Sequence, residues 1–339
     1  MGKALFYKKP KKDFIQCLAC YHFCLIEKGG RGFCGVRKNH NGKLKLLVKN
    51  KPIAINIDPI EKKPLFHFSP GEKAFSLGTL GCNFSCEFCQ NWDISQEPKN
   101  KDEKSIYWGE NWPPKKIIDY CQKNDLKVIA YTYNEPTIWV EYALEIMKRA
   151  KKKKIKNVWV SNGFMSEKTI KEMAPYLDAI NIDLKSFSDE FYQKICQGKL
   201  TPVKENIRKI YQLGIWVEIT TLIIPGLNDS ENEIKEIANF LKSISPNIVW
   251  HLSAFYPAYK MLDHKITPTE ILFKAYQIGK EAGLKYIYTG NIPNLETEST
   301  YCPNCQKMVI QRLGIQLIEN KLIKNKCPFC GYKIEGIFE

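Results

Sequence analysis

One loop of the sequence reads Gly81-Cys82-Asn83-Phe84-Ser85-Cys86-Glu87-Phe88-Cys89-Gln90, with three cysteines in the spacing C-x3-C-x2-C. Cysteines clustered this tightly in a chain of this length are metal ligands more often than disulfides. Three thiolates cannot close a tetrahedral zinc site, and they leave one corner of an iron–sulfur cubane without a protein ligand. The loop therefore predicts a metal centre with an open position, where a small molecule can bind and be activated. The alternative is a structural zinc site whose fourth ligand lies elsewhere in the chain.

The loop follows an apolar stretch, residues 73–80, that is typical of a buried strand, and strands and helices then alternate along the chain. Further strands are expected at residues 127–131, 158–161, 179–184, 216–223, 248–253 and 286–289. Helices are expected at residues 114–124, 136–151, 167–176, 204–213, 230–243 and 267–282, with start signals at Ser230 and at Thr267-Pro268. This order predicts an α/β fold, a partial parallel (β/α) TIM-like barrel with right-handed crossovers. A doubly wound open sheet is the alternative that the pattern leaves open.

Polar residues stand where the predicted strands end. Beyond the cysteine loop they are Thr132-Tyr133-Asn134-Glu135, Ser161-Asn162-Gly163, Asp183-Leu184-Lys185, Pro225-Gly226, His251, Ser253 and Gly290-Asn291. Because the carboxyl ends of parallel barrel strands meet at one face, we expect these groups around one site. Each also has a structural explanation, with Glu135 or Ser161 as a helix cap, Gly163 in a turn, and Asp183 and Lys185 as a solvated pair.

The three-cysteine loop, with an aromatic residue before its last cysteine, resembles the cluster motif of the radical S-adenosylmethionine (SAM) superfamily. Longer stretches are similar to the AmmeMemoRadiSam-system branch, which is related to pyruvate formate-lyase activating enzymes; they are residues 58–68, 81–83, 89–92, 131–137 and 288–293. The resemblance spans nearly the whole chain, from Cys17 to about Cys330. It implies that Cys82, Cys86 and Cys89 hold a [4Fe-4S] cluster whose fourth iron binds SAM. It also implies reductive cleavage of SAM to a 5′-deoxyadenosyl radical.

The resemblance also implies roles for the residues at the strand ends. Phe88 would lie near the adenine of SAM, and Asn134-Glu135 stands where relatives have a Gly-Gly-Glu motif that binds the SAM amino group. Ser161-Asn162-Gly163 is similar to a Thr-Asn-Gly strand end, and Asp183-Leu184-Lys185 matches an Asp-Leu-Lys motif. Lys185 would then face the SAM carboxylate, with Asp183 holding Lys185 or the ribose. His251 is a further candidate for contact with SAM or substrate, and its alternative is a hydrogen-bonded core residue.

Two further cysteine groups flank the predicted barrel. Cys17, Cys20, Cys24 and Cys34 supply four thiolates for a zinc ion or an auxiliary [4Fe-4S] cluster, and zinc is the favoured occupant. Cys302, Cys305, Cys327 and Cys330 form the paired knuckles of a zinc-ribbon or rubredoxin-like module, which binds zinc or a single iron. The predicted domains are an N-terminal Cys-rich extension (1–71), the barrel (72–295) and a C-terminal module (296–339).

The formal net charge of +15 raises the question of a nucleic-acid partner. Only 5 of the 51 basic residues are arginine, the residue that reads bases and grips phosphates, so the charge argues weakly for nucleic acid. The lysine run at residues 151–154 could still attract a polyanion. No apolar run approaches the roughly 18 residues of a membrane span, and no signal segment is evident, so we expect a cytoplasmic protein with no membrane partner.

The sequence therefore predicts a radical SAM enzyme that abstracts hydrogen from an acceptor it does not identify. The activating-enzyme resemblance suggests a protein residue as acceptor, and the chemistry needs an electron donor such as ferredoxin or flavodoxin. An RNA-modifying radical SAM enzyme is one alternative, motivated by the basic charge. A non-catalytic adaptor with zinc at all three cysteine groups is the alternative from another class.

Overall fold

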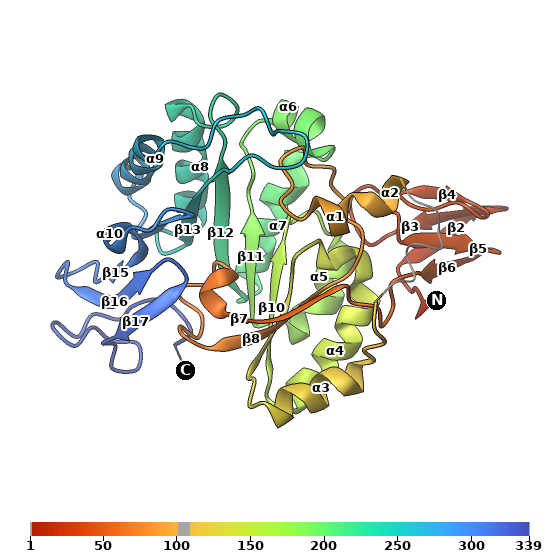
Figure 1. The fold of residues 1–339 in the computed structure, drawn as a ribbon, viewed down its shortest axis with the longest axis horizontal. Coiled ribbons are helices and arrows are strands. Elements are labelled where there is room, and N and C mark those ends of the chain that lie inside the picture. The colour runs from red at the N-terminus through yellow and green to blue at the C-terminus, as the bar shows by residue number, and fades with distance from the viewer. Residues whose placement is uncertain (1, 101–108, 339) are drawn as a thin grey trace.

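The computed structural model describes residues 2–100 and 109–338 and is built around one eight-stranded sheet (Figure 1). Its strands are β7 (Ala54–Pro59), β8 (Lys73–Gly78), β9 (Val128–Tyr131), β10 (Lys156–Ser161), β11 (Ala179–Asp183), β12 (Trp216–Ile223), β13 (Val249–Ala254) and β14 (Tyr286–Gly290). Strands β8 to β14 are parallel and neighbour one another in chain order, whereas β7 pairs antiparallel with β8 at one edge. A doubly wound sheet would break that order, so the predicted partial barrel is confirmed.

Amphipathic helices cover the outside of this sheet. They are α3 (Pro114–Lys123), η3 (Pro136–Trp139) leading into α4 (Val140–Lys152), α5 (Glu167–Met173) with η4 (Ala174–Tyr176), α7 (Leu200–Gln212), α8 (Glu231–Ile244) and α9 (Thr269–Ala282). The Ser230 hydroxyl accepts a hydrogen bond from the Glu233 amide (3.3 Å), as its N-cap position predicts. The Glu233 carboxylate, which in a capping box would accept from the Ser230 amide, accepts from the Phe187 amide (2.7 Å).

A segment before β8 plugs the barrel at the amino ends of its strands. It begins with the 3-10 helix η1 (Ile60–Lys62), and its apolar side chains Leu65 and Phe68 pack against Val128 and Ala179. The amides of Phe66 and His67 donate to the buried Glu218 carboxylate on β12 (2.9 and 2.8 Å). The predicted boundary at residue 71 therefore cuts through the barrel, whose sheet and plug already begin at Ala54.

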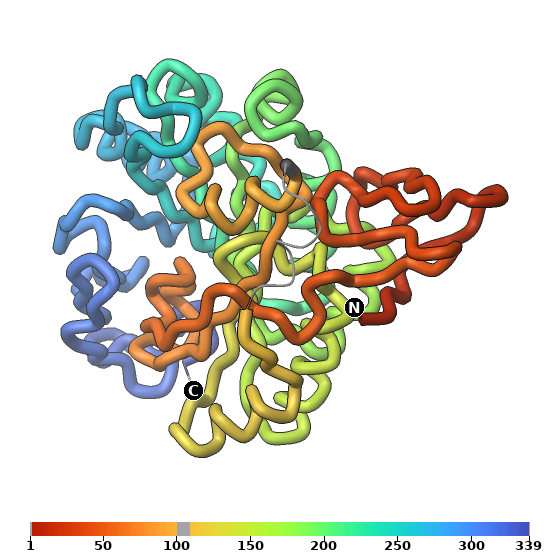
Figure 2. Tube along the Cα trace, turned by 45° about the vertical axis from the view of Figure 1, so that its right-hand side comes forward, coloured from red at the N-terminus to blue at the C-terminus, as the bar shows by residue number. Residues whose placement is uncertain are grey.

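The N-terminal residues form a small β module beside the barrel (Figure 2). Its strands are β1 (Gly2–Lys3), β2 (Tyr7–Lys11), β3 (Phe14–Cys17), β4 (Leu25–Glu27), β5 (Arg37–His40) and β6 (Lys43–Leu46), in the sheets β2-β3-β4 and β1-β6-β5. A buried ion pair between Arg37 and Glu141 of α4 joins the module to the barrel, and Glu141 also accepts the Leu5 amide (2.8 Å). Apolar residues of the module belong to the same core as the barrel helices.

The C-terminal module contains α10 (Leu295–Glu298), β15 (Thr300–Tyr301), β16 (Met308–Leu313) and β17 (Gln316–Asn320). Its buried Val309 and Ile334 pack against Val249 and Tyr286, the first residues of β13 and β14. The buried Arg312 guanidinium donates to the Phe66 carbonyl (2.6 Å), so the module also contacts the plug. None of the helices in residues 2–100 and 109–338 is long and apolar enough to cross a membrane.

Candidate active site

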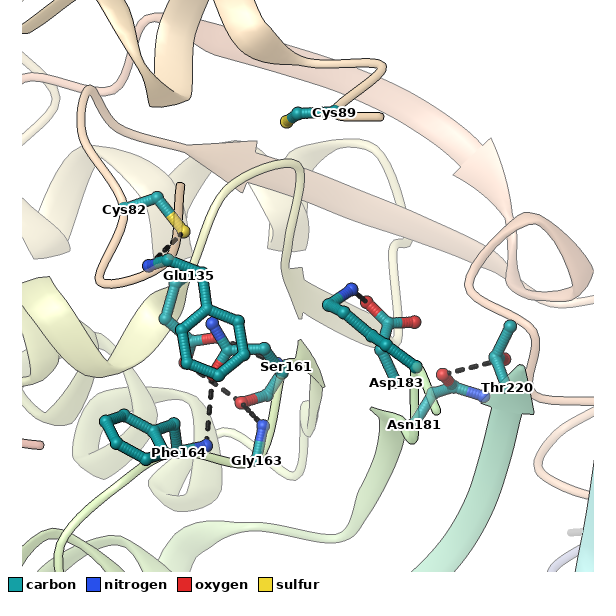
Figure 3. Close-up of polar contacts among 12 residues, drawn as sticks. Cys82, Cys89, Glu135, Ser161, Gly163, Phe164, Asn181, Asp183 and Thr220 are labelled. Carbon is teal, nitrogen blue, oxygen red and sulfur yellow. Dashed lines mark hydrogen bonds and ion pairs between the residues drawn. The ribbon is translucent and has the colours of Figure 1, made fainter. Parts of the chain in front are cut away.

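A cavity of about 540 Å³ opens at the carboxyl ends of the barrel strands. This is the face where parallel barrels carry their working groups, and the volume lies in the range of small-molecule sites. Figure 3 shows Cys82 and Cys89 on the loop after β8, beside the strand ends that carry Glu135, Ser161 and Asp183. Cys86 also lines the cavity, so the three predicted thiols face one space.

The cysteine loop is held by tight local packing. Gly81 has φ +90°, and a Cβ atom there would lie 2.5 Å from the Cys34 carbonyl oxygen, so the turn requires glycine. Two short helices, α1 (Trp92–Ser95) and α2 (Glu97–Asn100), follow the loop, and the Ser95 hydroxyl lies 3.1 Å from Cys89 Sγ. The loop backbone also docks on the π-helix η5 (Tyr192–Cys196), through the Ser85 amide bonded to the Cys196 carbonyl (2.8 Å).

Cys86 is buried and Cys82 and Cys89 are half-buried, and all three thiols prefer to be neutral without a metal. Burial raises the pKa of Cys82 and Cys89, and the pKa of Cys86 is raised first by a hydrogen bond with Cys196 and then by burial. A positive centre reverses this preference, because coordinating thiols are deprotonated. Three convergent thiols in one polar cavity fit a cluster that takes three protein ligands and leaves its fourth corner to a ligand.

Glu135 lies at the wall of the same cavity, directly before η3. Its Oε1 accepts from the Ser161 hydroxyl (2.9 Å) and the Thr137 amide (3.1 Å), and its Oε2 accepts from the Asn162 amide (2.8 Å). Burial raises the pKa of Glu135, and these hydrogen bonds oppose that rise. Glu135 is therefore the N-cap of η3, as its structural explanation held. It is also an acid of the cavity wall whose Oε2 accepts fewer hydrogen bonds than Oε1 does.

Asp183 and Lys185 lie across the cavity, at the end of β11. Lys185 Nζ is 3.0 Å from Asp183 Oδ2 and 5.6 Å from the centre of the Phe88 ring. Burial would lower the pKa of Lys185, but Asp183 and Cys86 outweigh burial and raise that pKa well above its usual value. A stably charged ammonium group with a carboxylate partner therefore lies next to an aromatic ring, as a site for a polar, charged nucleotide requires.

The structure brings ten of the predicted residues to this cavity; they are Cys82, Cys86, Phe88, Cys89, Asn134, Glu135, Ser161, Asn162, Asp183 and Lys185. His251 is the exception among the predicted SAM contacts. Its Nε2 lies 2.7 Å from the Glu218 carboxylate, it is buried against Phe66, and the cavity wall does not include it. The prediction of a ligand contact at His251 is therefore corrected to the core position given as its alternative. Ser253, two residues further along β13, lines the cavity instead.

Tyr133, one of the expected strand-end residues, joins two residues that were not predicted at the site, Asp58 and Lys63. The Tyr133 hydroxyl donates to Asp58 Oδ2 (2.6 Å), which also accepts from the buried Lys63 ammonium (2.7 Å). Burial would raise the pKa of Asp58, but hydrogen bonds from Lys63 and Tyr133 outweigh it and lower that pKa far below its usual value. Tyr133 and Lys63 line the cavity, and Tyr133 holds a positive φ of 69°. The stretches 58–68 and 131–137, already singled out by their resemblance, were the available signal.

The four C-terminal cysteines form a compact metal-type group. Their sulfurs lie within 4.8 Å of one another, with Cys302 Sγ 3.6 Å from Cys330 Sγ and Cys305 Sγ 3.7 Å from Cys327 Sγ. A tetrahedral zinc ion with Zn–S bonds of about 2.3 Å sets its sulfurs about 3.8 Å apart. Hydrogen bonds from the Asn304 side chain and the Tyr332 amide lower the pKa of Cys330 to about 6. The predicted set is thus able to bind a metal ion.

Comparison with known proteins agrees with this fold. The family model of the radical SAM superfamily matches residues 77–241. The chain is 39% identical over 338 residues, 99% of both chains, to an uncharacterised protein of Methanocaldococcus jannaschii. It is 22% identical over 169 residues, 48% of this chain and 67% of the relative, to a pyruvate formate-lyase-activating enzyme of Clostridium pasteurianum. A radical SAM methyltransferase structure from Sphaerobacter thermophilus shares the fold (TM-score 0.51, 14% identity, 66% of this chain and 68% of that chain).

A partial parallel barrel that directs three thiols into a cavity at the carboxyl ends of its strands is typical of an α/β enzyme with a metal centre in its active site. The chain belongs to the radical SAM superfamily, and within it to the relatives of the activating enzymes. Membership implies a [4Fe-4S] cluster and SAM, and the donor set at the cavity fits both.

Proposed function

We propose that this chain cleaves SAM reductively and abstracts a hydrogen atom from a carbon of a protein acceptor, as an activating enzyme does. The observation that carries the proposal is the convergence of Cys82, Cys86 and Cys89 on the cavity that Glu135 and Lys185 also line. When bound, the cluster and SAM supply the chemistry, which is release of methionine and a 5′-deoxyadenosyl radical. The protein supplies binding, orientation and exclusion of water.

The cavity residues divide the recognition of SAM between them. Glu135 Oε2 presents a carboxylate oxygen to the SAM ammonium, since only the Asn162 amide among the described contacts uses it. Lys185, kept charged by Asp183, offers the partner for the SAM carboxylate, and Asp183 also has an exposed edge for the ribose. Phe88 offers an aromatic face for the adenine. Asn134 holds the loop rather than the ligand, because its side chain donates to the Gly81 carbonyl (2.7 Å).

The acceptor class is inferred from the relatives, among them the pyruvate formate-lyase-activating enzyme. The electron comes from a low-potential one-electron donor of the ferredoxin or flavodoxin class. We assign the chain to the cytoplasm, since thiolate-bound iron needs reduced cysteines. We also assign zinc to the C-terminal cysteines, because their sulfur separations of 3.6 and 3.7 Å match a tetrahedral zinc site.

The test is anaerobic reconstitution with iron and sulfide, followed by dithionite and SAM, with 5′-deoxyadenosine and methionine measured by chromatography. We expect both products from the wild type and none from Cys86→Ala. Cys121→Ala is the matched control, because Cys121 is a buried thiol of α3 outside the cysteine groups. Reconstituted wild type that holds an iron–sulfur cluster but forms no 5′-deoxyadenosine would refute the proposal, as would protein that binds only zinc at all three cysteine groups.

A further inference from the structure

The four N-terminal cysteines surround a second cavity, separate from the active-site cavity. Cys17, Cys20, Cys24 and Cys34 all line it, and its wall also includes His22, Phe33, Arg37 and Asn83. The four thiols come from β3, from the turn after it, and from the loop before β5. The fold thus directs four separate thiols into one enclosed space, as a multi-atom centre requires.

The spacing of these sulfurs differs from that of the C-terminal zinc-type group. Within residues 2–100 and 109–338, only the C-terminal cysteines bring three or more ligand atoms within 4.8 Å of one another. The N-terminal sulfurs therefore stand further apart, as do those of Cys82, Cys86 and Cys89. A single zinc ion needs its sulfurs about 3.8 Å apart, whereas each thiolate of a cubane binds a different iron atom and so lies further out. The chain therefore contains one cysteine group with closely spaced sulfurs and two groups with widely spaced sulfurs.

The wall of this cavity supplies hydrogen-bond donors and positive charge. The Phe33 amide donates to Cys24 Sγ (3.4 Å), and the amides of Ala19, His22 and Val36 lie near the sulfurs of Cys17, Cys20 and Cys34. The buried Arg37 guanidinium interacts with Cys17 and Cys34 as well as with Glu141. An anionic centre is favoured by such an environment, since amide donors and a cation compensate buried negative charge.

Asn83 supplies an independent observation. It is fully buried, its Oδ1 accepts from Asn162 Nδ2 (2.7 Å), and its Nδ2 has no hydrogen-bond partner among the described residues. A buried donor without an acceptor costs about 1 to 3 kcal/mol, so it calls for an explanation. A zinc ion offers no acceptor of its own, whereas a cubane brings four inorganic sulfides to this wall.

The second cavity also adjoins the active-site loop. The Cys34 carbonyl packs against Gly81, next to Cys82, and His22 Nε2 lies 2.6 Å from the Asn83 carbonyl. The half-buried Lys99 ammonium interacts with both Cys34 and Cys82. The two cysteine groups are therefore neighbours: residues 81–83 contact the N-terminal group and include Cys82, and the Lys99 ammonium lies near one cysteine of each group.

We propose that Cys17, Cys20, Cys24 and Cys34 hold an auxiliary [4Fe-4S] cluster, in place of the zinc ion that the sequence favoured. All four of its irons have a protein thiolate, so this cluster binds no SAM. It lies beside the SAM cluster, close enough for the two paramagnetic reduced clusters to interact.

The test counts metals in three anaerobically reconstituted proteins and needs no activity. The wild type should hold about eight irons and about eight sulfides per chain, from two cubanes, with about one zinc. The variant Cys82→Ala/Cys86→Ala/Cys89→Ala should keep about four irons and lose the spectral response to SAM. The variant Cys20→Ala/Cys24→Ala should also keep about four irons, and it should retain that response. In the reduced wild type, electron paramagnetic resonance should show broadening that neither variant shows.

A wild type with about four irons and about two zinc ions per chain would overturn the proposal, and this measurement depends on no variant. So would a triple alanine variant that folds and holds zinc but no iron. The two proposals fail separately: loss of iron from the triple variant refutes the auxiliary cluster, whereas missing 5′-deoxyadenosine in eight-iron wild type refutes the proposed reaction.

Discussion

Replacement of Glu135 by Gln should weaken SAM binding while leaving the cluster in place. The substitution preserves the volume of a buried side chain but removes its charge, and the new amide nitrogen competes for the position of Oε2, which accepts from the Asn162 amide at 2.8 Å. A hydrogen bond to a charged group contributes about 1.5 to 3 kcal/mol. Since about 1.4 kcal/mol is a factor of ten, SAM binding should weaken by roughly 10- to 150-fold.

The assay is titration of SAM into anaerobic, oxidised-cluster protein by calorimetry, with iron content measured on the same sample. Thr137→Val is the matched control, because the Thr137 hydroxyl donates to the same carboxylate but leaves its charge. This control should change the SAM dissociation constant by less than about threefold, since it removes one donor to Oε1 and leaves the carboxylate charge and Oε2 in place. Equal dissociation constants for wild type and Glu135→Gln, at equal iron content, would refute the assignment of the ammonium site.

The pH dependence gives a second readout of the same carboxylate. Burial raises the pKa of Glu135, so its protonated form is reached at a higher pH than that of an exposed glutamate. An ammonium ligand needs the ionised form, so the affinity for SAM should fall as the pH falls through this raised pKa. In Glu135→Gln that fall should vanish, and a pH profile identical to that of the wild type would show that another group titrates.

Three further perturbations have defined outcomes. Lys185→Met should weaken SAM binding about tenfold, because it removes the ammonium paired with Asp183 at 3.0 Å; unchanged affinity by calorimetry would contradict this. Burial lowers the pKa of His67 to about 4 from an ordinary 6.5. Below pH 6.5 the unfolded chain therefore binds a proton that the folded protein does not, so the free energy of unfolding is lower by about 2 kcal/mol at pH 5 than above pH 6.5. His67→Gln should therefore flatten the decline of the urea midpoint between pH 7 and 5, and an unaltered decline would exclude His67 as its source. Cys305→Ala/Cys327→Ala should release about one zinc per chain, measured by mass spectrometry, with the iron content unchanged; retained zinc would contradict the C-terminal assignment.

The barrel strands could be predicted because buried parallel strands are continuous apolar runs. The expected strand at residues 216–223 is β12 residue for residue, and the other expected strands differ from the observed ones by a few residues at their ends. Strand β7 and the plug could not be found in this way. The stretch 58–68 carries prolines and charges, and its amides bond to Glu218, about 150 residues further along the chain. A partner at that separation leaves no trace in local periodicity.

Residues of the cavity wall could be predicted where a motif fixed both residue type and position, as in the cysteine loop and at Glu135. The prediction failed at His251, because the position of a residue near the end of a strand does not reveal how far its side chain lies below the cavity. His251 and Ser253 share one face of β13, and residues two apart on a barrel strand lie in successive layers. Ser253 belongs to the upper layer, which lines the cavity, and His251 to the layer below, which contains Glu218. The contact of His251 Nε2 with the Glu218 carboxylate (2.7 Å) shows this depth, and local sequence does not reveal it.

The layer of side chains below the cavity connects the C-terminal module to the active site through hydrogen bonds. Arg312 of the module donates to the Phe66 carbonyl, and the Phe66 amide donates to Glu218 beneath the cavity. Burial would raise the pKa of Glu218, but the hydrogen bond with His251 outweighs it and lowers that pKa, so the carboxylate remains an acceptor for all its donors. Loss of the C-terminal metal should therefore loosen the plug as well as the tail, because Arg312 is fixed by the strand that the metal site anchors. The zinc-type module is better understood as part of the floor of the barrel than as an appendage.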